Sequence, residues 1–226
     1  MGGNTYFVTG TDTGSGKTWL TLGLLSAFRK RGYTSLGMKP IASGCRWLDD
    51  ELVSEDAELI RKYSSSNLPY QLVNPLAFES ACSPSLAAQM EKAEVVIEPI
   101  LNAYKALSEQ CDVTVLEGIG GWRVPFSENF GAAELVKAVN ADIILVVAIR
   151  LGCINHTLLT LEAINSDDAK LACWVAICTE PDFEFFDQTV KFLQESVNFP
   201  LLGVIPFLQK LDPSTIGSHL NLDLLL

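Results

Sequence analysis

Gly10-Thr11-Asp12-Thr13-Gly14-Ser15-Gly16-Lys17-Thr18 is the stretch that decides the fold of this chain. It fits the pattern Gly-x-x-x-x-Gly-Lys-[Ser/Thr], with an apolar run over residues 5–9 before it and an amphipathic stretch over residues 19–30 after it. A buried strand, a glycine-rich loop and a helix in this order predict a phosphate-binding P-loop. The alternative is an ordinary Gly-rich turn, but such a turn does not require Lys and Thr in this register.

The residues of the loop have distinct expected roles. Backbone N–H groups of Gly14, Ser15 and Gly16 would surround an anion, and the helix N-terminus adds unpaired donors and a partial positive charge. Lys17 would reach the β- and γ-phosphates, and the Thr18 hydroxyl would ligate Mg2+. The motif therefore predicts a nucleotide with its Mg2+.

The composition is that of a globular protein, and we expect one domain over residues 1–226, with 48% hydrophobic and 19% charged residues. A net charge of −11 without a Lys/Arg cluster argues against nucleic acid and against a membrane surface as partners. Residues 1–4 leave no room for a signal peptide, and the longest apolar run, 143–149, is too short to span a bilayer. Six scattered cysteines are typical of a reducing cytosol, so we expect a cytoplasmic protein without a structural zinc.

The rest of the chain alternates unbroken apolar runs with longer helical segments. The clearest predicted strands are 113–116, 143–149, 172–177 and 201–205. The predicted helices are 55–63, 83–91, 95–110, 131–139, 155–164 and 183–197. This pattern predicts an α/β, P-loop NTPase-like fold with a mostly parallel sheet and helices on both faces. Residues 45–54 and 64–72 are expected to be loops, 212–214 a turn, and the Leu-rich tail is expected to pack on the core.

Polar residues after the second predicted strand permit two interpretations each. Lys39 is either a second cation that faces a transferring phosphate or a carboxylate, or a surface lysine at a strand end. Ser43, before Gly44, either contacts an anion or turns the chain. Asp56, taken alone at the start of the helix 55–63, is best explained as a charge that complements the helix dipole.

Two later strand ends carry a clearer signal. Glu117 ends the run 113–116 and precedes Gly118-Ile119-Gly120-Gly121, which places a carboxylate where a P-loop fold holds Mg2+ directly or through water. The glycines allow a ligand to approach closely. After Arg150, a turn through Gly152 opens another helix, and its N-terminus is suited to a carboxylate. A plain loop-to-helix junction is the alternative there.

Several motifs, taken together, resemble the dethiobiotin synthetase family. They are the P-loop stretch 9–18, Lys39-Pro40-Ile41-Ala42-Ser43-Gly44, Glu117-Gly118-Ile119-Gly120-Gly121-Trp122, Leu151-Gly152-Cys153-Ile154-Asn155-His156 and Gly203-Val204-Ile205-Pro206. Their order and spacing agree over essentially the whole chain, and the second and fourth motifs are far more specific than the P-loop.

The resemblance implies a reaction. It is the closure of a cyclic urea on 7,8-diaminopelargonic acid with CO2 (or bicarbonate) and ATP. An amine would form a carbamate, the carbamate oxygen would attack the γ-phosphate, and the second amine would displace phosphate from the carbamic-phosphoric anhydride. Catalysis would consist of positioning and of neutralising phosphoryl charge. A homodimer is also implied, with the substrate site at its interface.

The resemblance further implies roles for individual residues. The γ-phosphate and the carbamate would be held by Lys17 and Lys39. The hydroxyls of Thr13 and Ser43 would contact the carbamate end of the substrate. The Mg2+ ligands fall to Thr18, Asp56 and Glu117. Residues around the nucleotide are Gly14, Ser15, Gly16, Ile177 and Pro206. Contacts to the rest of the substrate, its far carboxylate above all, fall to Gly120, Leu151, Gly152 and Asn155.

Three positions depart from the family pattern. Gly14-Ser15 stands where many members have Glu-Val, and Arg150 stands where Lys is common. Ile177 stands where an Asn often reads the adenine edge. Since the Ile177 side chain cannot form a hydrogen bond, the sequence predicts weak selectivity among nucleoside triphosphates.

A P-loop fold of this kind has two alternative functions. An amidotransferase-linked synthetase acting on cobyrinic acid usually brings a glutaminase domain, for which 226 residues leave no space. A partitioning-type ATPase would act as a nucleotide switch on a protein partner. Such ATPases typically carry an extra Lys early in the P-loop, where this chain has Thr11, Asp12 and Thr13.

Overall fold

A computed structural model describes residues 3–226 and shows an α/β fold built on one six-stranded sheet. Its strands run in the order β10-β9-β8-β1-β7-β2, and every pairing among them is parallel. Their bounds are β1 Asn4–Gly10, β2 Ser35–Met38, β7 Val113–Gly121, β8 Asp142–Ala148, β9 Leu171–Ile177 and β10 Leu201–Ile205. The predicted fold class is thereby confirmed.

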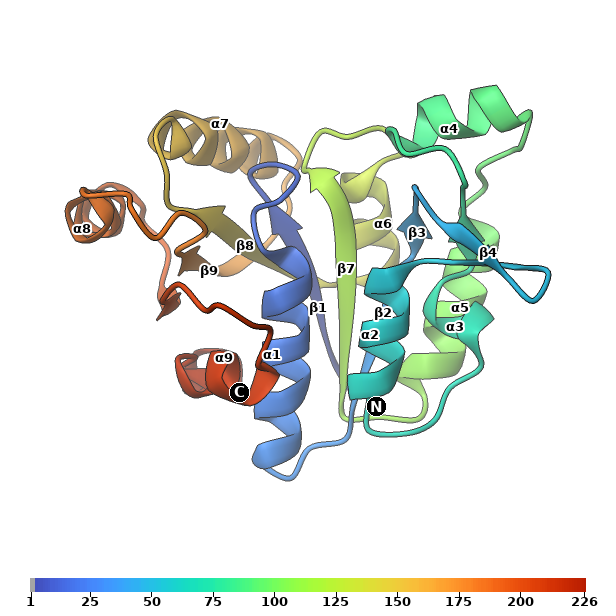
Figure 1. Cartoon of the computed structure of the whole chain (residues 1–226), viewed down its shortest axis with the longest axis horizontal. Coiled ribbons are helices and arrows are strands. Elements are labelled where there is room, and N and C mark those ends of the chain that lie inside the picture. Colours follow the sequence, from blue (N-terminus) through green and yellow to red (C-terminus); the bar gives the residue numbers. More distant parts are fainter. Residues whose placement is uncertain (1–2) are drawn as a thin grey trace.

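Helices cover both faces of the sheet (Figure 1). In that view α1 and α9 lie in front of the sheet and α6 lies behind it, while α7 and α4 stand at the upper edge, where β7 ends. The helices are α1 Lys17–Lys30, α2 Glu55–Tyr63, α3 Tyr70–Val73, α4 Pro84–Glu91, α5 Glu98–Ser108, α6 Ala132–Val139, α7 Cys153–Ser166, α8 Phe186–Ser196 and α9 Pro213–Ser218.

The chain reverses its direction of winding at β1, and this places the P-loop. From β1 it moves outward to β2, returns to β7, and only then crosses to β8 on the other side of β1. Ligands of open parallel sheets bind at such a switch point, outside the carboxyl ends of the strands. The loop after β1 therefore lies between the strand ends of β7 and β8.

The buried strands explain why the sheet forms where the sequence predicted it. In β8, every residue from Ile143 to Ala148 is buried, and in β1 the same holds from Thr5 to Gly10. Such continuous apolar strands require cover on both faces, which a parallel sheet receives from its crossover helices. Trp174, Phe7 and Phe28 are among the largest fully buried side chains of this core.

Several boundaries predicted from the sequence are wrong. Residues 45–54 are not a plain loop, because Arg46–Leu48 (β4) and Glu51–Val53 (β5) form an antiparallel hairpin. Two short strands, β3 Ile41–Ala42 and β6 Leu76–Ala77, also pair outside the main sheet. The predicted helix 95–110 is shorter, because α5 begins only at Glu98, followed by a proline in its first turn.

The end of the third long strand and the C-terminal turn also differ from the prediction. Strand β7 does not end at Glu117 but continues to Gly121, because Gly10 of β1 still pairs with Gly121. Residues 212–214 are the start of α9, with the Asp212 carboxylate capping the N–H groups of Ser214 and Thr215.

The Leu-rich tail packs on the core, as predicted. Leu222 and Leu225 are buried, the Tyr6 hydroxyl donates to the Leu225 carbonyl, and Arg31 pairs with Asp223. Burial, together with the nearby Asp142 carboxylate, raises the pKa of Tyr6 to about 12. Met1 and Gly2, on which the expected absence of a signal peptide partly rests, lie outside the described residues. No helix in residues 3–226 is long and apolar enough to cross a membrane.

Candidate functional site

The P-loop has the backbone that its glycines permit. Gly14 and Gly16 have φ angles of 75° and 95°, in the left-handed region that strains other residues. A Cβ on Gly10 would lie 2.1 Å from the Ser15 Oγ, so the loop closes tightly on the end of β1. Gly16 is the N-cap of α1, which leaves the first N–H groups of the helix available to an anion.

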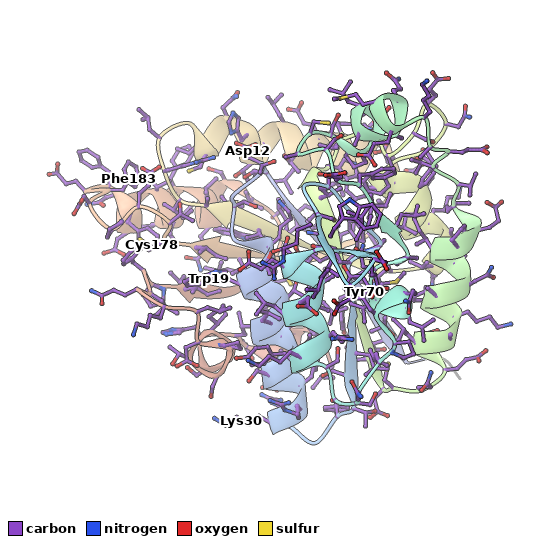
Figure 2. The ribbon with its side chains drawn as sticks, turned by 45° about the vertical axis from the view of Figure 1, so that its right-hand side comes forward. Asp12, Trp19, Lys30, Tyr70, Cys178 and Phe183 are labelled. Carbon is purple, nitrogen blue, oxygen red and sulfur yellow. The ribbon has the colours of Figure 1, made fainter. Side chains whose placement is uncertain are left out.

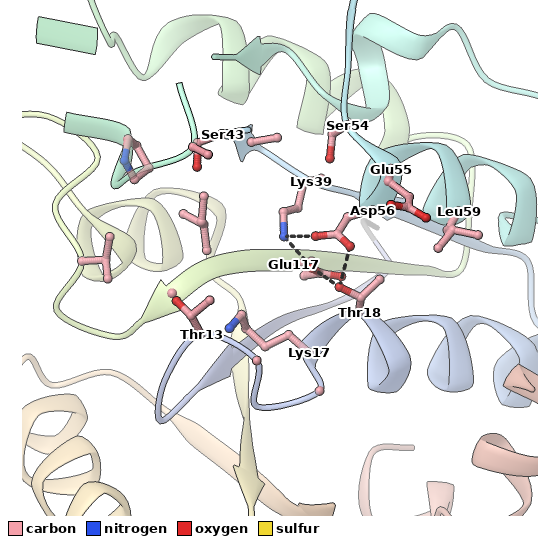
Figure 3. Close-up of a pocket in the computed structure, with 18 of the residues that line it drawn as sticks. Thr13, Lys17, Thr18, Lys39, Ser43, Ser54, Glu55, Asp56, Leu59 and Glu117 are labelled. Atoms are coloured by element: carbon pink, nitrogen blue, oxygen red, sulfur yellow. Dashed lines mark hydrogen bonds and ion pairs between the residues drawn. The ribbon is translucent and has the colours of Figure 1, made fainter. Parts of the chain in front are cut away.

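Four side chains converge beside this loop, from α1, α2, β7 and the residue that follows β2 (Figure 3). The Lys39 Nζ lies 2.5 Å from the Glu117 Oε1 and 3.1 Å from the Asp56 Oδ2. The Thr18 hydroxyl donates to the same Glu117 oxygen at 2.9 Å and lies 3.0 Å from the Asp56 Oδ1. Lys39 is 4% exposed and Glu117 1% exposed, which rules out the interpretation of Lys39 as a surface lysine.

The two lysines of the site have opposite electrostatic surroundings. Burial, together with the charge on Lys39, lowers the pKa of Lys17 to about 8, against the opposing effect of Glu117, Asp56 and Asp12. Burial also disfavours the charged form of Lys39, but the Glu117 and Asp56 carboxylates outweigh it and raise the pKa of Lys39. Lys39 is therefore held as an ammonium between two carboxylates.

The oxygen atoms of this cluster fit a magnesium ion that is shared with a nucleotide. No group of three or more His, Cys, Asp or Glu side chains within residues 3–226 could hold a metal by itself. Mg2+, however, usually takes only one or two carboxylates and completes its shell with water and phosphate oxygens. Glu117 contributes a further oxygen, Oε2, that is buried and has no hydrogen-bond partner in the described part of the chain.

A buried network fixes two of these groups, and the sequence analysis missed it. The Tyr70 hydroxyl accepts from the Ser54 N–H at 2.7 Å and donates to the Asn74 Oδ1 at 2.9 Å. The Asn74 amide in turn donates to the Lys39 carbonyl at 2.7 Å. Because Ser54 is the N-cap of α2, which carries Asp56, the network holds the backbones of Lys39 and Asp56 together. The prediction of a loop over residues 64–72 is wrong at its end, because α3 begins at Tyr70, and that prediction gave Tyr70 no role.

A cavity of about 880 Å³ opens over the cluster. Ten of the predicted site residues line it, which are Thr13, Gly14, Gly16, Lys17, Thr18, Lys39, Ser43, Asp56, Glu117 and Gly120. Figure 3 shows Thr13 and Lys17 on one side of the cavity and Ser43 and Lys39 on the other. Its other walls include apolar residues that the sequence analysis did not single out, which are Ala42, Ala81, Pro84, Ile119 and Val124.

The remaining predicted residues are not lining residues of this cavity. Ser15 is fully buried in the loop. Leu151, Gly152 and Asn155 are exposed at the start of α7, and Leu151 is 90% exposed. Ile177 does reach the P-loop, because a Cβ on Gly16 would lie 2.8 Å from its Cδ1. Pro206 follows Ile205, the register partner of Ile177 on the adjacent strand.

All six cysteines are free thiols within the described chain. Burial raises the pKa of Cys45, Cys111 and Cys153, and that of Cys173 to about 12. These thiols therefore resist ionisation. Cys45, Cys153 and Cys173 are buried, whereas Cys82, Cys111 and Cys178 are partly exposed.

The fold and the site define a P-loop nucleotide-binding protein, and the model of the family described as an AAA domain matches residues 4–215. An ATP-dependent dethiobiotin synthetase BioD from Cellvibrio japonicus is 38% identical over 226 residues, covering 100% of this chain and 99% of the relative. Another from Aromatoleum aromaticum is 38% identical and covers 96% of both chains. The chain therefore belongs to the family of ATP-dependent dethiobiotin synthetases, and the resemblance seen in the sequence is confirmed.

More distant solved structures share the fold alone. The septum site-determining protein MinD from Pyrococcus horikoshii, complexed with Mg-ADP, has a TM-score of 0.51 at 15% identity, over 97% of this chain and 87% of that one. Chloroplast FtsY from Physcomitrella patens also has a TM-score of 0.51, at 17% identity, over 96% of this chain and 64% of that one. At this identity the likeness says nothing about which reaction the site performs.

Proposed function

We propose that this protein is an ATP-dependent dethiobiotin synthetase that carboxylates 7,8-diaminopelargonic acid with CO2 and closes the ring, with ADP and phosphate as the other products. The observation that carries the proposal is the buried Lys39, which lies in the same cavity as the P-loop Lys17. Two cations facing one space suit a reaction that brings a carbamate to a γ-phosphate, since both groups are anionic. The family membership supports the same reaction.

The residues around the cavity suggest a division of tasks. Lys17 and the P-loop N–H groups would hold the phosphates, while Lys39 would hold the carbamate and bear charge that develops on the transferring phosphoryl group. Thr13 and Ser43 line opposite sides of the cavity and would contact the carbamate end of the substrate. The apolar walls at Ala81, Pro84 and Val124 would receive the hydrocarbon chain of the substrate.

Magnesium would be held by Thr18, Asp56 and Glu117. When bound, the ion would neutralise phosphate charge and orient the β- and γ-phosphates. Lys39 shares hydrogen bonds with both carboxylates, so its ammonium would have to shift toward the γ-phosphate and the carbamate as the ion binds. The long stem of a lysine allows that movement without a change of the backbone.

The far carboxylate of the substrate would be received at the start of α7, by Leu151, Gly152 and Asn155. These residues are exposed and do not line the cavity that holds the two lysines. We propose that they act on the site of a second copy, in a homodimer whose substrate binds at the interface. The 226 residues would then form one domain per subunit.

The decisive experiment supplies the protein with diaminopelargonate, bicarbonate, Mg2+ and ATP and looks for dethiobiotin by mass spectrometry. We expect product that requires all four components. If no product forms, and a protein partner instead stimulates ATP hydrolysis, the partitioning-type ATPase becomes the better assignment.

Base selectivity is expected to be weak, because Ile177 stands at the base end of the P-loop and its side chain offers no hydrogen bond. The measurement is kcat/KM for ATP against GTP and CTP. A preference for ATP above about a hundredfold, or ~2.7 kcal/mol, would contradict this expectation.

A further inference from the structure

The P-loop carries a carboxylate of its own, on Asp12. The Asp12 Oδ1 accepts a hydrogen bond from the Thr13 N–H at 2.7 Å, and the Asp12 carbonyl accepts from the Lys17 Nζ at 2.9 Å. Asp12 therefore contributes to the order of the loop through both its side chain and its backbone. The same carboxylate places a negative charge in a loop whose task is to bind phosphate, which opposes that binding.

A cation from another element lies against this carboxylate. The Arg150 Nη2 is 3.0 Å from the Asp12 Oδ2. Arg150 follows β8 and precedes Gly152, the N-cap of α7, so it reaches the loop from the neighbouring strand end. Figure 2 shows Asp12 at the upper edge of the molecule, beside α7. The loop is also attached to β8 through its backbone, since the Thr11 N–H donates to the Val146 carbonyl.

We propose that Arg150 is a positioning residue for the nucleotide: it neutralises the Asp12 carboxylate that orders the P-loop, so that the loop accepts phosphate without like-charge repulsion. The Asp12–Thr13 hydrogen bond needs only an acceptor oxygen, which an asparagine also supplies. The negative charge of Asp12 is thus separable from its structural contribution. Within residues 3–226 the Arg150 side chain makes one hydrogen bond, through a single nitrogen, and a lysine could also make it.

The charge account predicts a specific pattern among variants of the full-length protein. Arg150→Met leaves Asp12 uncompensated and should weaken binding of Mg2+ with a non-hydrolysable ATP analogue about fivefold, or ~1 kcal/mol, measured by calorimetry at low salt. Asp12→Asn should bind at least as tightly as the unaltered protein. The affinity of the double variant Asp12→Asn/Arg150→Met should lie within about twofold of that of the unaltered protein. The same is expected of Arg150→Lys.

A matched control lies at the other end of the same strand. Lys170 and Asp142, at the amino end of β8, form an ion pair at 2.7 Å, far from the P-loop end of that strand. Lys170→Met removes another ion-paired cation, one that is more exposed than Arg150, and should leave nucleotide affinity unchanged. The deficit of Arg150→Met should also shrink below about twofold at 0.5 M salt, because the pair is partly exposed and therefore screened.

Two outcomes would overturn the proposal. One is unchanged nucleotide affinity in Arg150→Met. The other is a loss in the double variant as large as in Arg150→Met, because a structural role of Arg150 would not be rescued by removing the opposite charge. The inference rests on the proposed use of ATP at this loop but not on the diamine chemistry. Absence of dethiobiotin with the unaltered protein would contradict the proposed function and leave this binding comparison intact.

Discussion

The two ends of the proposed substrate site are built in opposite ways. At the phosphate end, Lys39 and Glu117 are almost completely buried, and Thr18 and Asp56 bond to them directly. At the far-carboxylate end, Leu151 and Asn155 are exposed. The phosphate end is already assembled within one chain, whereas the far-carboxylate end faces outward.

This difference indicates which end of the proposed site would depend on a second copy. Buried charges must be paired within the fold that buries them, since an uncompensated one costs several kcal/mol. The exposed N-terminus of a helix needs no such charge pairing, so it can contact a ligand that is bound at another site. Changes at the phosphate end should therefore affect stability and turnover together, and changes at α7 should affect substrate binding or assembly alone.

Lys39→Met should give the largest effect of any variant considered. It leaves Glu117 and Asp56 without their cation, so we expect the free energy of unfolding to fall by about 3–5 kcal/mol, measured in urea without nucleotide. Added Mg2+ and nucleotide should restore part of this loss, because the metal again compensates the carboxylates. Turnover should fall by about 10²–10³. Lys170→Met, which removes an exposed cation, is the control. Equal stability of the two variants would contradict the explanation that Lys39 stabilises the fold by pairing with Glu117 and Asp56.

The hydrophobic core outside the proposed site should respond to alkaline pH through Tyr6, whose hydroxyl bonds to the C-terminal tail. The pKa of Tyr6 is raised to about 12 in the folded protein, from 10.0. A raised pKa means that the folded protein holds the proton more tightly, so this stabilisation is complete below pH 10 and is lost as pH rises toward 12. The loss should amount to about 2–3 kcal/mol.

The measurement is urea unfolding across that pH range. Tyr6→Phe should remove this part of the alkaline decline, at the cost of the hydrogen bond to the C-terminal tail. Tyr33→Phe, at an exposed position, keeps Tyr6 and should keep the decline. An unchanged pH slope in Tyr6→Phe would show that the burial of Tyr6 is not the cause.

Asn155→Asp tests the exposed end. A carboxylate at the start of α7 would repel the far carboxylate of the substrate, so we expect the KM for diaminopelargonate to rise about tenfold, or ~1.4 kcal/mol, with the KM for ATP unchanged. Asn165→Asp places the same charge near the other end of α7 and should change neither value. Equal effects of the two variants would remove α7 from the substrate site.

Leu151→Asp should have the smallest effect on the folded subunit. Leu151 is 90% exposed, so the free energy of unfolding at low protein concentration should change by no more than about 0.5 kcal/mol. If α7 lies at a dimer interface, the same variant should shift the protein toward monomer in analytical ultracentrifugation. A Leu151→Asp dimer as tight as the unaltered one would place the interface elsewhere.

The sequence by itself determined the strands of the main sheet, most of the helices and the P-loop, but not the β4–β5 hairpin or the β3–β6 pair. Continuous apolar runs predicted every strand of the main sheet, and the helix over residues 55–63 was predicted with its exact bounds. The P-loop could be predicted because it depends on local backbone geometry, which a short sequence motif specifies. The motif consists here of Gly14, Gly16, Lys17 and Thr18. Glu117 was found because a carboxylate after a buried run is unusual, although its strand continues to Gly121.

Only the tertiary structure decided how the distant groups meet. Lys39 and Glu117 are 78 residues apart, and neither residue's neighbours in sequence show that they form a buried ion pair. The contact follows from strand order, because β2 and β7 are adjacent and parallel and so end at one edge. The Tyr70–Asn74 network and the Arg150–Asp12 pair are invisible in the sequence for the same reason: each joins side chains whose separation is set by packing of the whole fold.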